Sequence, residues 1–185
     1  MRLSDEVWAI IPARGGSKGI PRKNLAPLAG RPLIHYTIDA VRRHARVIVS
    51  TDDSEIAKVS KAGGAEVPFL RPAELATDNA SVRDALFHTL DRLVEEEGTA
   101  PRAVLILFPT SPFRPAGVVE EVLGRLEDNY LAVTVFPHGE AMKSLGLVTA
   151  FRWSPRGSRP FEGTAPLGSY AFVPVSNPLA LVDIA

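Results

Sequence analysis

The sequence contains no cysteine, which excludes disulfide bonds, thiolate metal sites and cysteine nucleophiles. It also lacks a long apolar run, because no stretch approaches the roughly 18 residues that a membrane-spanning helix needs. Charge of one sign is not in excess either, since 21 basic residues balance 21 acidic ones. No net field therefore attracts nucleic acid or an anionic membrane surface, and we expect neither as a partner.

The N-terminus does not have the pattern of a signal peptide. Asp5 and Glu6 precede an apolar run directly, whereas a signal peptide begins with positive charge and a longer apolar segment. We therefore expect the protein in the cytoplasm. A chain of 185 residues has the natural size of one α/β domain, so a single domain over residues 1–185 is predicted.

An early stretch combines an apolar run with a basic, glycine-rich loop. Residues 7–11 are β-prone and stop at Pro12, which predicts a buried strand that opens into a loop. Within residues 14–23 the loop carries glycines, which bring backbone N–H groups close to an anion, and four cations: Arg14, Lys18, Arg22 and Lys23. This pattern predicts a polyphosphate site, and a solvated basic loop is the alternative.

Two common phosphate motifs do not fit this loop. A P-loop requires Gly-Lys-Ser or Gly-Lys-Thr, and neither tripeptide occurs in the sequence. A dinucleotide-binding fingerprint opens directly into a helix, whereas Pro21 and the polar residues 22–24 continue the loop. The loop is therefore of another kind.

Apolar runs that predict strands alternate along the chain with segments at helical spacing. This alternation predicts a mostly parallel, doubly wound, Rossmann-like α/β sheet. The late residues 144–151 and 170–173 predict two more strands without a long helix between them. The earlier strands are expected at 7–11, 46–51, 65–70, 103–108 and 130–136, and the helices at 31–44, 54–62, 82–97 and 118–126.

Acidic residues at two places leave two interpretations each. Asp52 and Asp53 follow a predicted strand, so they would hold a metal or a ribose, or else cap the next helix. Asp84, His88 and Asp91 share one helix face, as a metal site or as exposed hydrogen-bonding groups.

Residues 13–25, Ala-Arg-Gly-Gly-Ser-Lys-Gly-Ile-Pro-Arg-Lys-Asn-Leu, resemble the nucleotide-binding signature of the CMP-sialic acid synthetases. These cytidylyltransferases activate nine-carbon acidic sugars. Three further segments follow the family's order: Ser-Thr-Asp-Asp at 50–53, Arg-Pro-Ala-Glu-Leu-Ala with Asp and Ala-Ser over 71–81, and Pro-Thr-Ser-Pro-Phe-Arg at 109–114. The resemblance implies a nucleotide-diphospho-sugar transferase fold, a homodimer, and a dimerisation and sugar-site excursion at 137–169.

The resemblance also implies roles for individual residues. Arg14, Lys18 and Lys23 would offset charge on the reacting phosphates as catalytic residues. Asp183 would hold Mg²⁺. Thr110, Ser111 and Lys143 would contact the sugar. The nucleotide would contact Ala13, Arg14, Gly15, Gly16, Ser17, Lys18, Lys23, Asn24, Arg71, Ala80 and Ser81. An arginine fork at 71 suits phosphate or a cytosine edge, and Ser81 would also cap a helix.

Three positions depart from the family pattern. Phe108 stands where the family usually has glutamine, and Leu167 begins a Leu-Gly-Ser segment in place of Asn-Gly-Ala. The family's Asp-x-Asp metal pair has become Asp183-Ile184-Ala185, which keeps only the first carboxylate. Family members typically continue beyond this point, so we expect this chain to be a short or divergent member that lacks the closing helix.

The implied activity is transfer of CMP from CTP to the anomeric hydroxyl of a nonulosonic, sialic-acid-like 2-keto sugar acid, with Mg²⁺ and release of pyrophosphate. Two alternatives stay open. One is a nucleotide-binding homologue with weak or no catalysis, which the three departures favour. The other is a transferase for another 2-keto sugar acid, such as the eight-carbon acid of lipopolysaccharide. The sequence does not decide which sugar acid is activated.

Overall fold

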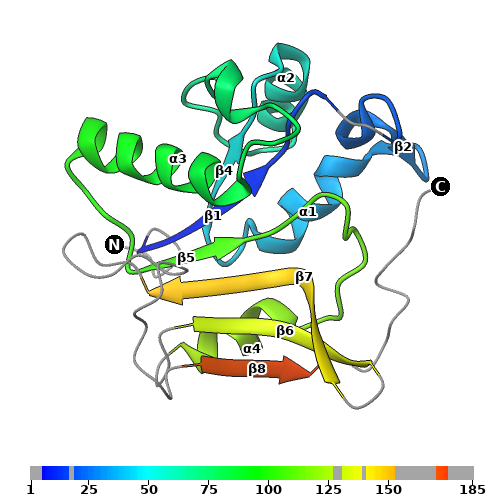
Figure 1. Cartoon of the computed structure of the whole chain (residues 1–185), viewed down its shortest axis with the longest axis vertical. Coiled ribbons are helices and arrows are strands. Elements are labelled where there is room, and N and C mark those ends of the chain that lie inside the picture. Colours follow the sequence, from blue (N-terminus) through cyan, green and yellow to red (C-terminus); the bar gives the residue numbers. More distant parts are fainter. Residues whose placement is uncertain (1–5, 17–18, 127–130, 139–140, 153–169, 175–185) are drawn as a thin grey trace.

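The computed structural model describes residues 6–16, 19–126, 131–138, 141–152 and 170–174, and all statements on structure concern these residues. They form a six-stranded sheet with the order β4-β1-β5-β7-β6-β8 (Figure 1). Every strand runs parallel to β1 except β7, which is antiparallel to both of its neighbours. The strands are β1 (Val7–Pro12), β4 (Arg46–Ser50), β5 (Ala103–Ile106), β6 (Leu131–His138), β7 (Ala141–Arg152) and β8 (Tyr170–Pro174).

Helices cover both faces of the sheet. They are α1 (Leu33–Val41), α2 (Ser54–Ala62), α3 (Val82–Glu97) and α4 (Val118–Arg125), with short 3-10 turns η2 (Lys23–Leu25) and η3 (Ala73–Leu75). A small antiparallel ribbon, β2 (Pro27–Leu28) and β3 (Arg31–Pro32), precedes α1. Among the described residues no helix has the length and apolar character to cross a membrane.

Alternate residues of the strands supply two separate cores. Ile10, Ile48 and Val104 point to the face that α3 covers with Leu86, Leu90 and its neighbours. Ile11, Val49 and Leu105 point to the other face, where apolar residues of α1, α2 and α4 pack. Successive side chains of a strand point to opposite faces of the sheet, so a strand that is buried on both faces is apolar at successive positions. The predicted two-sided α/β sheet is confirmed.

Two sequence predictions about this region are wrong in detail. Residues 65–70 do not form a strand: a single parallel bridge joins Glu66 to Ile48, and Pro68, which has no N–H, follows at once. The helix expected from residue 31 begins at Leu33, because Arg31 and Pro32 pair with the preceding strand β2. The extended backbone of Pro32 then serves as the N-cap of α1.

The late part of the chain returns to the sheet. The two strands predicted at 144–151 and 170–173 are present as β7 and β8, and β7 lies between β5 and β6. Part of the excursion predicted at 137–169 is therefore sheet, because residues 137–138 belong to β6 and 141–152 to β7. The rest of that range lies outside the described residues, and its dimerisation role stays a prediction.

Candidate functional site

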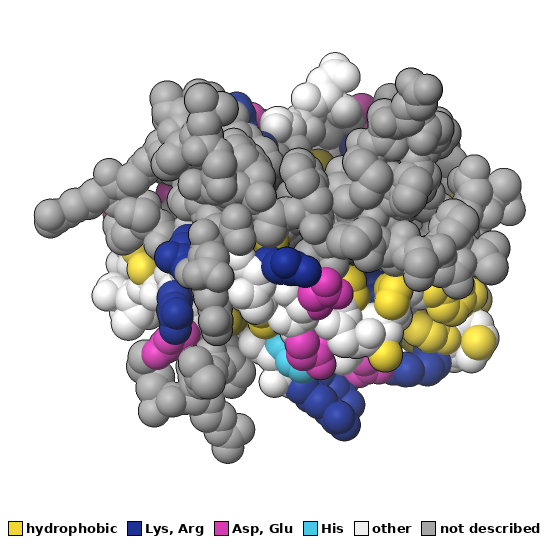
Figure 2. Space-filling view, turned by 90° about the horizontal axis from the view of Figure 1, so that it is seen from below, with side chains coloured by type: hydrophobic (Ala, Val, Ile, Leu, Met, Phe, Trp, Pro, Cys, Tyr) yellow, Lys and Arg dark blue, Asp and Glu magenta, His cyan; other side chains and the backbone are white. Residues whose placement is uncertain are grey.

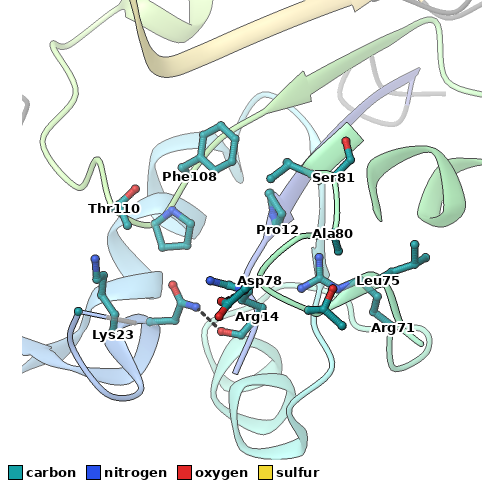
Figure 3. Close-up of a pocket in the computed structure, with 15 residues that line it drawn as sticks. Pro12, Arg14, Lys23, Arg71, Leu75, Asp78, Ala80, Ser81, Phe108 and Thr110 are labelled. Carbon is teal, nitrogen blue, oxygen red and sulfur yellow. Dashed lines mark hydrogen bonds and ion pairs between the residues drawn. The ribbon is translucent and has the colours of Figure 1, made fainter. Parts of the chain in front are cut away.

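A cleft of about 430 Å³ lies where the loops after β1 and β5 meet the segment between α2 and α3 (Figure 3). Parallel strands bring their carboxyl ends to one edge of the sheet, which is where open α/β sheets bind ligands. Three segments that are distant in sequence line the cleft. They contribute Pro12, Arg14, Gly19, Lys23 and Asn24, then Arg71, Leu75, Thr77, Asp78, Ala80, Ser81 and Val82, and finally Phe108, Pro109 and Thr110.

Three cations line this cleft. Figure 3 shows Lys23 and Arg71 at opposite sides, with Arg14 and Asp78 between them. Arg14 Nη1 forms an ion pair of 2.7 Å with Asp78 Oδ1, and both side chains are partly exposed. The cleft therefore presents separated positive groups that suit a ligand with several negative charges.

Arg71 is the buried member of this set. Its side chain is 4% exposed, and Nη2 lies 3.7 Å from Asp52 Oδ1, which is an ion pair beyond hydrogen-bond distance. Nε and Nη2 have no hydrogen-bond partner among the described residues. Burial lowers the pKa of Arg71 from its ordinary value, and Arg14 nearby adds to the effect. A buried guanidinium with unused donors costs free energy that an anionic or carbonyl ligand would recover.

The basic loop is anchored at its first residues. The Gly15 N–H donates to Asp52 Oδ1 at 2.9 Å, and the Ala13 N–H donates to the Ser50 carbonyl at 2.9 Å. Asn24 Nδ2 donates to the Arg14 carbonyl at 3.0 Å, which is the dashed line in Figure 3. A Cβ at position 15 would lie 2.9 Å from Asp53 Cβ, so only glycine fits there.

Asp53 caps a helix, as one of the two interpretations predicts. Its Oδ1 accepts the N–H groups of Glu55 and Ile56 at 2.8 and 3.0 Å at the start of α2. Burial raises the pKa of Asp53, but these two N–H groups and Arg22 outweigh it and the net pKa is lowered. Arg22 has a left-handed backbone, with φ of 52°, and pairs with Asp53 and Glu55, and it is not among the cleft-lining residues.

The acidic residues and the histidine considered as a metal site on α3 have separate contacts. Ser81 Oγ accepts the Arg83 N–H at 3.2 Å, which confirms the predicted cap, and Ser81 also lines the cleft. Asp84 pairs with Arg83, and the His88 ring packs edge-on against Phe69 with centroids 5.8 Å apart. Within the described part of the chain, no three His, Asp or Glu side chains are grouped as metal ligands.

The structure brings together seven of the residues predicted to bind nucleotide or sugar, and the roles of all of them stay predictions. These cleft residues are Arg14, Lys23, Asn24, Arg71, Ala80, Ser81 and Thr110. Ala13, Gly15 and Gly16 are not in the lining, and Ser111, at 5% exposure, is not either. Lys143 lies in β7 opposite Phe136. Ser17, Lys18 and Asp183 fall outside the described residues.

From the sequence, Arg114 either begins the next connection or contacts the substrate, and Asp78 has no predicted role. The position of Asp78 shortly after the Arg-Pro-Ala-Glu-Leu-Ala segment was the available signal, but its pairing with Arg14 follows only from the fold. Arg114 donates to the Phe108 carbonyl at 2.8 Å and to Thr37 Oγ1 at 3.1 Å. Burial lowers the pKa of Arg114 to about 10. Its contacts fix the loop after β5.

Comparison with known proteins places this chain in a family. Residues 8–145, about three quarters of the chain, match a family model described as cytidylyltransferase. A CMP-N,N'-diacetyllegionaminic acid synthase of Legionella pneumophila is 43% identical over 111 residues, covering 58% of this chain and 47% of the relative. An N-acylneuraminate cytidylyltransferase of Escherichia coli is 40% identical over 124 residues, or 65% and 28% of the two chains. A pseudaminic acid cytidylyltransferase of Campylobacter jejuni is 33% identical over 123 residues, or 65% and 53%.

Solved structures agree on the fold. A CMP:2-keto-3-deoxy-manno-octonic acid synthetase complexed with CTP has a TM-score of 0.64 at 19% identity, over 79% of this chain and 73% of that one. A 4-diphosphocytidyl-2C-methyl-D-erythritol synthase from Anaerococcus prevotii has a TM-score of 0.59 at 15% identity, over 80% and 72%. The chain spans about half or less of the length of the curated relatives named above. The match over residues 8–145 shows that this chain belongs to the cytidylyltransferase family.

Proposed function

We propose that this protein transfers CMP from CTP to the anomeric hydroxyl of a nonulosonic, sialic-acid-like 2-keto sugar acid and releases pyrophosphate. The names of its curated relatives, which refer to N-acylneuraminate, legionaminic acid and pseudaminic acid, support this substrate class. The observation that carries the proposal is the buried Arg71 with unused donors, in one cleft with Arg14 and Lys23.

The cleft suits a nucleoside triphosphate in size and charge. Its volume of about 430 Å³ falls within the range of small-molecule sites. In the reaction a bond forms between the sugar's anomeric oxygen and the α-phosphorus, the bond to the leaving pyrophosphate oxygen breaks, and the hydroxyl proton passes to water. Such phosphoryl chemistry is promoted mainly by positioning and by stabilising charge. Arg14, Lys23 and Arg71 supply positive charge on two sides of the ligand.

Other predicted residues complete this proposal. Ser17 and Lys18 of the basic loop would join Arg14 and Lys23 at the triphosphate, with the backbone N–H groups of Gly15 and Gly16 nearby. Asn24, Ala80 and Ser81 would contact the nucleoside. Thr110 would contact the sugar, together with Ser111 and Lys143.

A divalent metal belongs to the proposed reaction, and Mg²⁺ prefers oxygen ligands. The described residues alone do not form a magnesium site. Among them, Asp78 is the one carboxylate that lines the cleft, and it is paired with Arg14. Asp183, outside the described residues, is the proposed ligand. When bound, the metal would neutralise phosphate charge. We further propose that the protein works as a homodimer, as the resemblance implies, and that it works in the cytoplasm.

The test is pyrophosphate release with Mg²⁺, measured with CTP, ATP, GTP and UTP against a panel of nonulosonic acids. We expect release with CTP and at least one of these sugars, and little with the other nucleotides. Absence of sugar-dependent release across the panel would contradict the proposal.

Phe108 favours a second candidate. Its side chain lines the cleft where the family usually has glutamine, so an amide is replaced by an apolar ring. A homologue that binds CTP with weak or no catalysis would then show thermal stabilisation by CTP without turnover. The remaining alternative is a transferase for another 2-keto sugar acid. Competition between nine-carbon and eight-carbon 2-keto acids in the same assay distinguishes it from the proposed function.

A further inference from the structure

The carboxylate of Asp52 contacts two segments that are far apart in the sequence and that both contribute residues to the cleft. Its Oδ1 accepts the N–H of Gly15 at 2.9 Å, and the same oxygen lies 3.7 Å from Arg71 Nη2. Asp52 is not among the cleft-lining residues. It therefore acts on the cleft through its neighbours.

The backbone around Asp52 is fixed on both sides. Before it, β4 ends at Ser50, and the carbonyl of the fully buried Thr51 accepts the Arg71 N–H at 2.7 Å. After it, Asp53 caps α2 and its own N–H donates to Thr51 Oγ1 at 3.1 Å. A carboxylate on such a rigid segment sets the positions of the groups that it binds.

We propose that Asp52 is a positioning residue for nucleotide binding. One carboxylate oxygen fixes the start of the basic loop through Gly15 and holds the charged fork of Arg71. At 3.7 Å it offsets the buried charge while Nε and Nη2 keep donors available for a ligand. The inference rests on the proposed function, since it assumes that CTP is the ligand of the cleft.

Simple electrostatics makes the opposite prediction. A carboxylate beside a triphosphate site repels the ligand, so its removal as a charge alone would tighten CTP binding. If Asp52 acts by position, its removal weakens CTP binding because Gly15 and Arg71 lose their common anchor. The direction of the change therefore separates the two effects.

The experiment compares CTP dissociation constants from calorimetry for the wild type, Asp52→Asn and Asp52→Ala. Asparagine keeps an acceptor for the Gly15 N–H and loses the charge at Arg71, whereas alanine loses both. We expect affinity in the order wild type, Asn, Ala, with Ala roughly fivefold to tenfold weaker than wild type, as for loss of one ordinary hydrogen bond. Asp39→Asn is the matched control, because Asp39 pairs with Arg31 and is not among the residues that line the cleft.

Each other result has a distinct meaning. Equal or tighter binding by both variants overturns the positioning role of Asp52, as does a fall in thermal midpoint with unchanged CTP affinity, which marks a merely structural role. If Asp52→Ala does not fold, the comparison of Asn with wild type decides alone. A folded wild type that binds no CTP contradicts the proposed function itself. In an Arg71→Met background we expect the Asp52→Asn effect to shrink, and an undiminished effect would refute the coupling to Arg71.

Discussion

At the scale of single residues, the features of Arg71 that suit ligand binding are unfavourable for the stability of the fold. Its guanidinium is almost fully buried, its nearest carboxylate is beyond hydrogen-bond distance, and two of its nitrogens lack partners among the described residues. Groups in this state destabilise a protein unless a ligand satisfies them. This state supports the proposed role of Arg71 in ligand binding.

We expect Arg71→Met to lower CTP affinity at least about tenfold, because a charged hydrogen bond contributes roughly 1.5 to 3 kcal/mol. We expect the thermal midpoint without ligand to stay equal or to rise, since a buried guanidinium with unsatisfied hydrogen-bond donors is removed. Calorimetry with CTP and thermal unfolding measure the two effects. The control is Arg125→Met on α4, where Arg125 pairs with Glu121. This variant should change neither the CTP affinity nor the thermal midpoint. Loss of stability with unchanged CTP affinity would assign Arg71 to the fold alone.

Gly15→Ala should lower the free energy of unfolding by about 1 to 3 kcal/mol, the usual cost of overpacking. The new Cβ would lie 2.9 Å from both Cβ and Oδ2 of Asp53, which is itself held as a helix cap. Urea unfolding measures the effect. Gly16→Ala is the matched control for stability, since a Cβ there meets nothing within 4 Å. Equal stability of the two variants would show that the loop shifts without cost.

At the scale of elements, Arg46 connects three parts of the chain. From β4 it binds Glu66 of the adjoining segment at 2.7 Å and Glu97 at the end of α3 at 2.6 Å, and it stacks on the Trp8 ring of β1. The hydrogen bonds that Arg46 donates to the carboxylates of Glu97 and Glu66 raise the pKa of Arg46. This cluster ties α3 to the end of the sheet opposite the cleft-forming carboxyl ends.

The pH dependence of stability tests this cluster. The hydrogen bond from Arg46 lowers the pKa of Glu97 below its ordinary 4.5. Glu97 therefore contributes to the free energy of unfolding above pH 4.5, and this contribution is lost as the pH falls through the lowered pKa of Glu97. We expect Glu97→Gln to cost under about 1 kcal/mol at pH 7, because the side chain is partly exposed, and progressively less as the pH is lowered. Urea unfolding over this pH range measures it, with Glu95→Gln as control. A cost that does not diminish in acid would rule out an ionic origin.

Some elements followed from the sequence and others did not. Ile10, Ile48 and Val104 belong to short apolar runs whose length and composition identify them as strands from local sequence alone. Residues 65–70 have a similar composition, yet only Glu66 pairs, because Pro68 interrupts the ladder. The antiparallel direction of β7 was not predictable from its own residues, since strand direction depends on where the chain re-enters the sheet.

At the scale of the whole molecule, positive charge is local rather than general. The formal net charge is zero. Figure 2 shows Lys and Arg side chains next to Asp and Glu side chains on the described part of the face that it views. The cleft concentrates Arg14 and Lys23, from the loop after β1, with Arg71, from the segment between α2 and η3. The fold thus gathers positive side chains at one edge of the sheet, which supports the proposed binding of an anionic ligand.

Ligand linkage gives a prediction for the entire domain. CTP at one hundred times its dissociation constant should stabilise the folded state by about 2.7 kcal/mol. For a domain of this size that corresponds to a rise of roughly 5 to 10 °C in the thermal midpoint. Thermal unfolding with CTP, and with ATP at the same concentration as control, measures it. An equal rise with both nucleotides would contradict a preference for cytidine.

The sequence by itself determined the alternation of buried strands and helices, the absence of cysteine chemistry and the motifs at 13–25, 71–81 and 109–114, because these depend on local composition and spacing. It also placed basic residues and glycines in one loop. Only the tertiary structure decided which of these groups meet. The ion pair between Arg14 and Asp78, and the shared oxygen of Asp52, join segments separated by dozens of residues. Such contacts arise from the parallel order of β4, β1 and β5, which no local pattern specifies.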